Sequence, residues 1–365
     1  MNVDYKSVVE LVLNCKSLIL NNDKAHQITV KGLADYVTQV DFSVQSYLTG
    51  ALAERYPDIH AQRLTERIRD VENTGNAGIL CGNGASELFM AVVHAVKPKK
   101  ILIPVPSFYG YEWAAQASGA EIIFYEMKEA HGFCLDEGIY ELLTEDMDLL
   151  FLANPNNPVG NILSEAFLMK LCEHCLRKGI RVVLDECFLE FTGENGFGAD
   201  KDRWEQYPNV VVVKAFTKLY AIPGVRLGYL MTGDLKLYEQ IKKQLPEWNL
   251  SVFAQLAGCA ALDEKEYRDR TVAIVQKERE YLMQELSKLG ITVYPGRADY
   301  LLLQTDLPLA ARLLERQILI RDCSNYRGLD AGFYRIAVKE HKENTILIQK
   351  LQDIEQQEGK NHGKH

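Results

Sequence analysis

Between residues 77 and 231, short runs of aliphatic and β-branched residues alternate with stretches of helical character. The runs are AGILCG, KKILIPVP, AEIIFYEM, DLLFLANP, IRVVLDE, NVVVVKAF and RLGYLMTG. Parallel strands need long crossover connections, usually helices, and strands buried on both faces are continuously apolar. The alternation therefore predicts an α/β fold with a mostly parallel sheet, in which ligands bind beyond the carboxyl ends of the strands.

The pattern changes after about residue 233. A long helical stretch reaches Gln284, interrupted near LPEWNLSV, and the strand-like runs ITVYPGRADYLLLQT and FYRIAVK follow. This is typical of a second, smaller α+β domain. We expect an N-terminal segment (1–40) packed on the small domain, a large ligand-binding domain (41–246), the small domain (247–352) and a disordered tail (353–365) that has little to bury.

Composition and charge exclude several function classes. The net charge of −9 and the lack of a Lys/Arg cluster argue against a nucleic-acid partner. No apolar run approaches the ~18 residues of a membrane span, and the N-terminus does not resemble a secretory signal, so we expect no membrane partner and a cytoplasmic location. The eight cysteines are scattered and predict reduced thiols. Cys172 and Cys175 lack a second ligand pair nearby, so no metal site is expected.

Five segments with chemically useful side chains each follow a predicted strand. In LCGNGASELF, a glycine turn leads into a helix, so the amides near Gly84, Ala85 and Ser86 can hold a phosphate, although a plain strand-to-helix turn is the alternative. In PVPSFYGYEW, Phe108 can stack on a planar ring, although aromatic residues are more often part of the core.

Two further segments carry an amide and a carboxylate. In FLANPNNPVG, an ordered turn leaves Asn157 to donate to an oxygen, unless the turn is purely structural. In IRVVLDECF, Asp185 ends an apolar strand, where a carboxylate is costly unless it is paired with a cation. A protonated heterocyclic nitrogen would serve, and a helix cap or an ion pair with arginine is the alternative.

The fifth segment, VVVVKAFTKLYAIPGVRLGYL, carries Lys218 between Thr217 and a turn that contains Arg226. A lysine held in such a pocket can lose its proton and form a Schiff base with an aldehyde. The five segments together supply a phosphate site, a ring stacker, a donor to a phenolic oxygen, a partner for a pyridine nitrogen and a Schiff-base lysine. These are the needs of one cofactor, pyridoxal 5′-phosphate.

At these residues the chain resembles the fold-type I pyridoxal-phosphate enzymes, the aspartate aminotransferase superfamily. Within it the chain is most similar to the group of histidinol-phosphate aminotransferases and threonine-phosphate decarboxylases. The resemblance covers roughly residues 40–350 and is carried by NPNNPVG, the Asp-Glu pair at 185 and 186, and TKLYAIPGVRLGYL. It implies an aspartate-aminotransferase-like fold with a large and a small domain.

The resemblance also implies roles for single residues. Lys218 would bond to the cofactor, Asp185 would pair with the ring nitrogen, Asn157 would contact the phenolic oxygen and the substrate, and Phe108 would stack on the ring. The residues implied for the phosphate are Gly84, Ala85, Ser86, Thr217 and Arg226. Tyr56 matches a tyrosine that reaches the neighbouring subunit's cofactor, which implies a homodimer with a shared active site.

Near the carboxyl end, Arg335 matches the arginine that binds a substrate anion, and Arg321 would be a second anion contact. Phe188 stands where many aminotransferases have a tyrosine and the decarboxylases have phenylalanine. Three features depart from the family pattern: Ala215 replaces a hydroxyl residue, the decarboxylases' His-Gly-Gly segment is absent, and their Ser-Ala-Asn is here SVQ at 43–45.

The resemblance implies an enzyme acting on a small-molecule amino acid that is phosphorylated or similarly dianionic. We expect a lyase like threonine-phosphate decarboxylase, with an aminotransferase of the histidinol-phosphate type, using 2-oxoglutarate and glutamate, as the alternative. A non-catalytic protein that binds pyridoxal phosphate is a second alternative.

Overall fold

The computed structural model describes residues 28–30, 36–38 and 56–362. Its largest sheet has seven strands in the order β3-β9-β8-β7-β6-β4-β5. The strands are β3 (Gly78–Gly82), β4 (Lys100–Val105), β5 (Glu121–Glu126), β6 (Leu149–Ala153), β7 (Arg181–Asp185), β8 (Val210–Ala215) and β9 (Gly228–Thr232). Every neighbouring pair from β8 to β5 is parallel, whereas β9 runs antiparallel to both β3 and β8. The predicted α/β fold with a mostly parallel sheet is confirmed.

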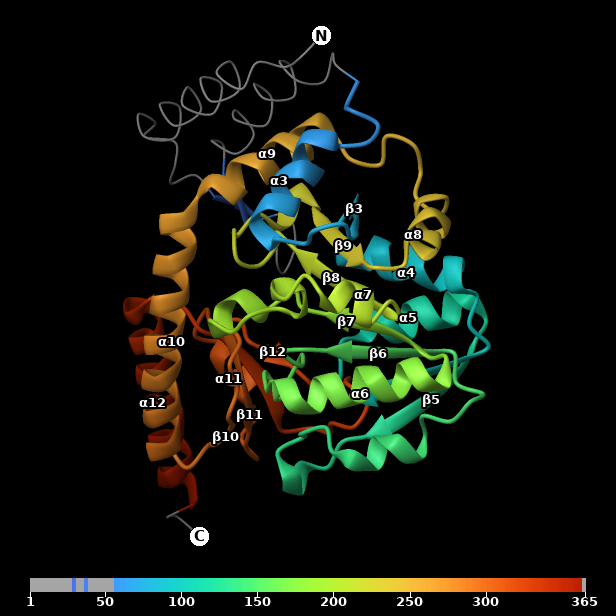
Figure 1. Ribbon diagram of the computed structural model, residues 1–365. Helices are drawn as coiled ribbons and strands as arrows, with labels where there is room; N and C mark the ends of the chain where they lie inside the picture. Colours follow the sequence, from blue (N-terminus) through green and yellow to red (C-terminus); the bar gives the residue numbers. More distant parts are fainter. Residues whose placement is uncertain (1–27, 31–35, 39–55, 363–365) are drawn as a thin grey trace.

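Helices cover both faces of this sheet (Figure 1). One face packs against α3 (Gln62–Glu72), α6 (Glu165–Lys178) and α9 (Val252–Asp263), and the other packs against α4 (Ala85–Val96), α5 (Tyr109–Ser118) and α8 (Leu235–Lys242). The short helix α7 (Arg203–Gln206) adds Trp204 to the first core. Because both faces are covered, residues 210–213 of β8 are all fully buried, which explains their unbroken apolar run.

A smaller antiparallel sheet forms the carboxyl-terminal part, in the order β10-β11-β13-β12. Its strands are β10 (Thr292–Tyr294), β11 (Tyr300–Gln304), β12 (Arg321–Asp322) and β13 (Phe333–Ala337), and its helices are α10 (Lys265–Lys288), α11 (Leu309–Leu314) and α12 (His341–His362). Figure 1 shows α10 and α12 side by side along this sheet, and all three helices contribute to one core with it. The expected large and small units are both present, while their boundaries at 246 and 352 stay a prediction.

The tail differs from the sequence prediction. Helix α12 runs to His362, so residues 353–362 are helical and not the start of a disordered tail. The reason is that Leu351 and Ile354 are buried in the carboxyl-terminal core, and they hold this part of the helix in place. Of the segment 1–40, only the antiparallel strand pair β1 (Ile28–Val30) and β2 (Tyr36–Thr38) lies within the described residues, so the expected packing of this segment on the small domain stays a prediction.

A buried charge cluster supports the segment that follows β7. Lys214 Nζ of β8 lies 2.9 Å from Glu72 Oε1 of α3 and 3.4 Å from Glu190 Oε1, which lies in the 3₁₀ turn η4 (Leu189–Thr192). Tyr229 Oη donates to Glu72 Oε1 at 2.6 Å. Burial raises the pKa of Glu190, and Lys214 opposes that rise. One buried cation therefore links α3, β8 and the turn after Asp185.

We expect Lys214→Met to lower the free energy of unfolding by about 3–5 kcal/mol, because it leaves two glutamates in the interior without their cation. Urea denaturation of the cofactor-loaded protein measures the change. Lys201→Met, at an exposed lysine, is the matched control and should change the unfolding free energy little. An unfolding free energy of Lys214→Met equal to that of the control would contradict this account of the cluster.

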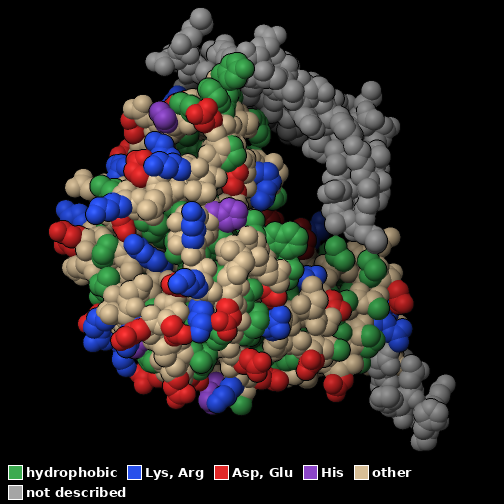
Figure 2. All heavy atoms as spheres, turned by 90° about the vertical axis from the view of Figure 1, so that its right-hand side faces the viewer, with side chains coloured by type: hydrophobic (Ala, Val, Ile, Leu, Met, Phe, Trp, Pro, Cys, Tyr) green, Lys and Arg blue, Asp and Glu red, His purple; other side chains and the backbone are tan. Residues whose placement is uncertain are grey.

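The surface agrees with the mixed composition. On the face shown in Figure 2, Lys and Arg side chains are interspersed with Asp and Glu. None of the helices in the described part of the chain combines the length and the apolar character that a bilayer span requires.

Candidate active site

The five predicted segments meet at one edge of the large sheet. Residues 83–86 follow β3, residues 106–108 follow β4, residues 154–157 follow β6, Asp185 ends β7, and residues 216–218 follow β8. The strands β4, β6, β7 and β8 are parallel to one another. Both β3 and β8 run antiparallel to β9 and therefore point the same way, so the carboxyl ends of all five strands lie at one edge of the sheet. Segments far apart in the sequence are thereby brought to one place.

The turn before α4 lies against Arg226. Gly84 is the N-cap of α4 with φ +81°, and a Cβ built on it would lie 2.7 Å from Arg226 Nη2. A Cβ on Gly228 would lie 2.9 Å from the amide nitrogen of Ala85. The first amides of a helix have no intrahelical partner, so these amides and the exposed guanidinium together form a candidate anion site. Within residues 56–362, Arg226 makes no ion pair.

The other residues predicted for the phosphate differ in exposure. Ser86 is exposed in the first turn of α4, and Thr217 is buried directly before Lys218. Ala215 is buried at the end of β8 and brings no hydroxyl to the site. Any anion contact on this side must therefore come from the neighbouring residues.

Asp185 is buried and hydrogen-bonded at both oxygens. Its Oδ1 accepts from the Cys187 amide at 2.9 Å, and its Oδ2 accepts from Tyr111 Oη at 2.5 Å. Burial raises the pKa of Asp185, while the hydrogen bonds and the positive charge of Lys218 oppose the rise. The carboxylate has no arginine partner among the described residues, so a cationic group that reached it would gain a strong interaction.

Phe108 lies beside Tyr111, the residue that donates a hydrogen bond to Asp185. Its ring packs edge-on against Tyr111 at 5.6 Å between centroids, and Tyr111 stacks on Phe151 at 5.1 Å. The sequence prediction missed Tyr111, although it stands within the aromatic run that was singled out. Its burial and its hydrogen bond to Asp185 mark it as a support for the carboxylate.

Lys218, Asn157 and Arg335 are joined by a row of contacts. Lys218 Nζ lies 5.2 Å from the centroid of the Phe188 ring, and Phe188 packs edge-on against Tyr300 at 5.0 Å. On the other side, Arg335 Cζ lies 4.9 Å from the Tyr300 ring, and Arg335 Nη1 donates to Asn157 Oδ1. Lys218 itself is exposed, which differs from the expected pocket and leaves its amine accessible from solvent.

The two predicted anion-binding arginines are cross-strand neighbours. Arg321 of β12 and Arg335 of β13 are directly paired in an antiparallel register, so their side chains project from the same face. Arg321 Nη2 donates to Asn325 Oδ1 at 2.8 Å and its Cζ lies 5.5 Å from the Tyr326 ring. Like charges directly opposite each other repel, and a bound anion would relieve that repulsion.

Two more residues of this region were missed by the sequence prediction. Tyr300 is buried and its Oη donates to the carbonyl of Asn156 at 2.7 Å, next to Asn157. Asp299 precedes it, and its Oδ1 is buried without a hydrogen-bond partner in the part of the chain that the structure describes. Both stand in ADYLLLQ, where the only available signal was a strand-like run after a polar residue.

Tyr56 stands apart from these residues. Its side chain is 87% exposed, and its ring contact is with Trp248 at 5.8 Å between centroids. The SVQ segment at 43–45 lies outside the described residues.

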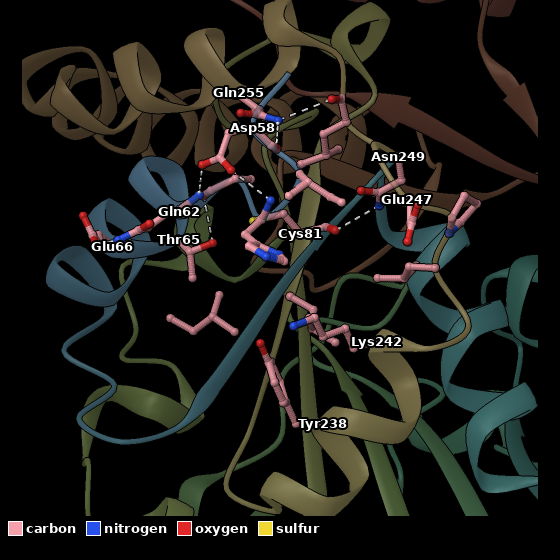
Figure 3. A pocket seen from close by; sticks show the side chains of 18 of the residues that line it. Asp58, Gln62, Thr65, Glu66, Cys81, Tyr238, Lys242, Glu247, Asn249 and Gln255 are labelled. Atoms are coloured by element: carbon pink, nitrogen blue, oxygen red, sulfur yellow. Dashed lines mark hydrogen bonds between the residues drawn. The ribbon is translucent and has the colours of Figure 1, made fainter. Parts of the chain in front are cut away.

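A cavity of about 800 Å³ lies at the free edge of β3, between α3 and α8 (Figure 3). It is lined by residues that include Asp58, Thr65, Cys81, Tyr238 and Lys242. Lys218, Asp185 and Arg335 do not line it. The cluster at the carboxyl ends of the strands, and not this cavity, is therefore the candidate active site.

Comparison with known proteins identifies the family of this fold and site. The model of the family "aminotransferase class I and II" matches residues 44–351. The chain belongs to the class I and II aminotransferase family. Among relatives of this aminotransferase-family chain, the threonine-phosphate decarboxylase of Salmonella typhimurium is 38% identical over 307 residues, covering 82% of this chain and 83% of the relative.

The histidinol-phosphate aminotransferase of Clostridium kluyveri is 31% identical over 305 residues, covering 82% of this chain and 84% of the relative. Among solved structures, the histidinol-phosphate aminotransferase of Clostridium acetobutylicum superimposes with a TM-score of 0.78 at 31% identity, covering 83% of this chain and 91% of that one. The chain is therefore an enzyme that depends on pyridoxal phosphate and resembles both a decarboxylase and aminotransferases.

The residues present fit this cofactor. The space beside Gly84 that a Cβ would fill faces a guanidinium and helix amides, which suits a phosphate. Asp185 is a buried carboxylate to which no cationic side chain of residues 56–362 is bonded, which suits a protonated pyridine nitrogen. Lys218 offers an accessible primary amine at the same sheet edge.

Proposed function

We propose that this enzyme is a lyase that decarboxylates a phosphorylated or similarly dianionic amino acid, as a threonine-phosphate decarboxylase does. The observation that carries the proposal is the register of Arg321 and Arg335, which gives one face of the small sheet two adjacent guanidinium groups. Guanidinium groups bind carboxylate and phosphate oxygens through paired, charge-assisted hydrogen bonds. Two of them in one place favour a substrate with two anionic groups.

We assign the cofactor contacts as follows. Lys218 forms the covalent link, Asp185 pairs with the ring nitrogen, and Phe108 stacks on the ring. Asn157 contacts the phenolic oxygen. The phosphate contacts are Gly84, Ala85, Ser86, Thr217 and Arg226.

The cofactor, when bound, withdraws electrons from the substrate's α-carbon and so weakens the bonds to that atom. The protein's own residues decide which of these bonds breaks, because they set the orientation of the substrate. If Arg335 held the α-carboxylate, the Cα–H bond would be left free to break and transamination would follow. If Arg321 and Arg335 held the distal phosphate instead, the α-carboxylate would be left free to depart as carbon dioxide.

Our proposal includes a homodimer with shared active sites, in which Tyr56 reaches the cofactor of the other subunit. The support is its exposure of 87% and its position beside the half-exposed Trp248, an aromatic pair that is open to a partner. The cytoplasmic location remains a prediction from the sequence.

The test supplies the pure enzyme with O-phosphothreonine, O-phosphoserine or histidinol phosphate, with and without 2-oxoglutarate, and measures both carbon dioxide and glutamate. We expect carbon dioxide from a phosphorylated amino acid without any need for 2-oxoglutarate. Histidinol phosphate has no carboxylate to lose, so it tests transamination alone. Glutamate formed from the phosphorylated amino acids with 2-oxoglutarate, in the absence of carbon dioxide, would refute the lyase.

Transamination is the second candidate, since the similarity to histidinol-phosphate aminotransferases also extends over four fifths of the chain. In the same assay, transamination would be recognised by glutamate that forms only when 2-oxoglutarate is present. The second alternative from the sequence, a protein that binds the cofactor without turnover, does not agree with the relatives, which are a decarboxylase and aminotransferases.

We expect Arg335→Ala to raise KM for a dianionic substrate by about tenfold to one hundredfold, because one charge-assisted contact contributes about 1.5–3 kcal/mol. Initial-rate kinetics with O-phosphothreonine measure the effect. The matched control is Arg327→Ala, since Arg327 is an exposed arginine of the same unit that pairs with Glu112. Equal KM values for the two variants would contradict the assignment of Arg335.

A further inference from the structure

Glu87 is a charged residue beside the proposed phosphate site to which the proposed function gives no role. It lies in the first turn of α4, and its carboxylate accepts hydrogen bonds from two asparagines. Its Oε2 accepts from the Asn83 amide at 2.7 Å and from Asn249 Nδ2 at 3.1 Å, and its Oε1 accepts from Asn83 Nδ2 at 3.1 Å. Glu87 therefore bonds back to a residue before the helix and closes the turn between β3 and α4 on itself.

The closed turn gives its amides different tasks. The Asn83 amide donates to the carboxylate just described, and the Gly84 amide donates to the Gly82 carbonyl at 2.8 Å. The amides of Ala85 and Ser86 come next, at the first two positions of α4, where a helix offers no acceptor to an N–H group. The direction of these two amides depends on the path of the turn before them. Whatever fixes the turn therefore fixes the part of the site that can hold an anion.

Asn249 holds the same turn from a distant segment. It lies between α8 and α9, 162 residues from Glu87 in the sequence. Its Nδ2 donates to the Cys81 carbonyl at 3.2 Å as well as to Glu87, and its own carbonyl accepts from Asn83 Nδ2 at 2.7 Å. Figure 3 shows the bond to Cys81 on the wall of the cavity at the free edge of β3. Asn249 thus bonds to β3, to the turn and to the first turn of α4.

The charge of Glu87 by itself does not explain these contacts. A carboxylate close to a bound phosphate repels it, so a role through charge alone would weaken the binding of the anion. A role in holding the turn would strengthen that binding, because both oxygens of Glu87 are engaged by N–H donors of the turn and of Asn249. The two roles therefore predict opposite effects when the charge is removed.

We propose that Asn249 is a positioning residue that acts through Glu87 and Asn83 and holds the turn 83–86 in the form that binds the phosphate of the cofactor. The inference rests on the phosphate contacts proposed above. Lys218 and Asp185 follow other strands and take no part in these bonds. The segment between α8 and α9 thereby contributes to the preference of this enzyme for the phosphorylated form of the cofactor.

The first test compares the binding of pyridoxal 5′-phosphate with that of pyridoxal, which lacks the phosphate, by equilibrium dialysis of the full-length protein freed of cofactor. We expect Asn249→Ala to raise the Kd of pyridoxal phosphate by about tenfold, because the variant loses a hydrogen bond to a charged group, and to leave the Kd of pyridoxal nearly unchanged. Asn76→Ala, at an exposed asparagine just before β3, is the matched control and should change neither constant. An equal loss of affinity for both ligands would show a merely structural role and overturn the inference, as would an unchanged Kd of pyridoxal phosphate.

Glu87→Gln separates position from charge. The glutamine places an NH₂ group where the carboxylate has its second acceptor oxygen, so that group meets an N–H donor of Asn83 or Asn249. The substitution also removes a negative charge beside the anion site. We expect weaker binding of pyridoxal phosphate, by about threefold to tenfold, because a hydrogen bond within the turn is lost. Equal or tighter binding overturns the inference, and this variant decides the question if Asn249→Ala does not fold.

Arg226→Ala reports on the proposed phosphate site itself. A Cβ on Gly84 would lie 2.7 Å from Arg226 Nη2, so the loss of this guanidinium should weaken the binding of pyridoxal phosphate whether or not Asn249 acts on the turn. Weaker binding in Arg226→Ala together with unchanged binding in Asn249→Ala overturns the inference and leaves the proposed function standing. Unchanged binding in both variants refutes the assigned phosphate contacts and the inference with them. None of these constants depends on whether the enzyme releases carbon dioxide.

Discussion

Lys218→Ala should abolish turnover and the covalent link to the cofactor while the fold is kept. The expected fall in kcat is at least about a thousandfold, because the variant loses both the covalent attachment and the acid–base group, and acid–base catalysis alone contributes about 10²–10⁴. The fold should survive because Lys218 is exposed and because, among the described residues, its amine contacts the Phe188 ring and makes no hydrogen bond or ion pair.

Two measurements check this result. Borohydride reduction followed by peptide mapping should label Lys218 in the wild type and leave the variant unlabelled, and circular dichroism should give the same thermal midpoint for both. Lys236→Ala, at an exposed lysine of α8, is the control and should retain both the label and the activity. Turnover near the wild-type rate in Lys218→Ala would refute the assignment of the lysine.

Asp185→Asn should lower kcat/KM by about 10²–10³ while the cofactor stays linked to Lys218. The substitution keeps the shape and the acceptor oxygen of the side chain but removes the charge that stabilises a protonated ring nitrogen, and the loss of one well-placed electrostatic partner in a site costs about this much. Steady-state kinetics together with the absorbance spectrum of the bound cofactor measure the two effects separately.

Tyr111→Phe separates the charge of Asp185 from its position. It removes the hydroxyl that donates to Asp185 Oδ2 and keeps the ring that stacks on Phe151. Since a neutral donor contributes about 0.5–1.5 kcal/mol, the expected loss is about tenfold at most. If Tyr111→Phe lost as much activity as Asp185→Asn, the effect would come from disordering the carboxylate and not from its charge.

Much of the fold could be predicted because its signals are local. The run VVVV in β8 and the run VVL in β7 are apolar without alternation, as strands covered on both faces must be. The helix over residues 353–362 was not predicted, because it depends on contacts with distant segments and not on a local signal. Residues 353–362 look too polar to fold alone, but Ile354 finds a core made by segments that are distant in the sequence.

The candidate site divides in the same way. Lys218, Asp185 and Asn157 each follow an apolar strand and could be singled out from their neighbours in the sequence. Tyr111 and Asp299 could not. What distinguishes Tyr111 is a hydrogen bond to a residue 74 positions away, and what distinguishes Asp299 is a buried oxygen without a partner among the described residues.

The sequence by itself determined the types and the order of the elements, and the chemistry of the cofactor, because strand burial and motif residues are properties of short segments. Only the tertiary structure decided which side chains meet. Lys214 and Glu72 are 142 residues apart, and Arg321 and Arg335 are neighbours only through the register of two strands. Such pairs depend on how the chain closes over long distances, and no local pattern of residues records that.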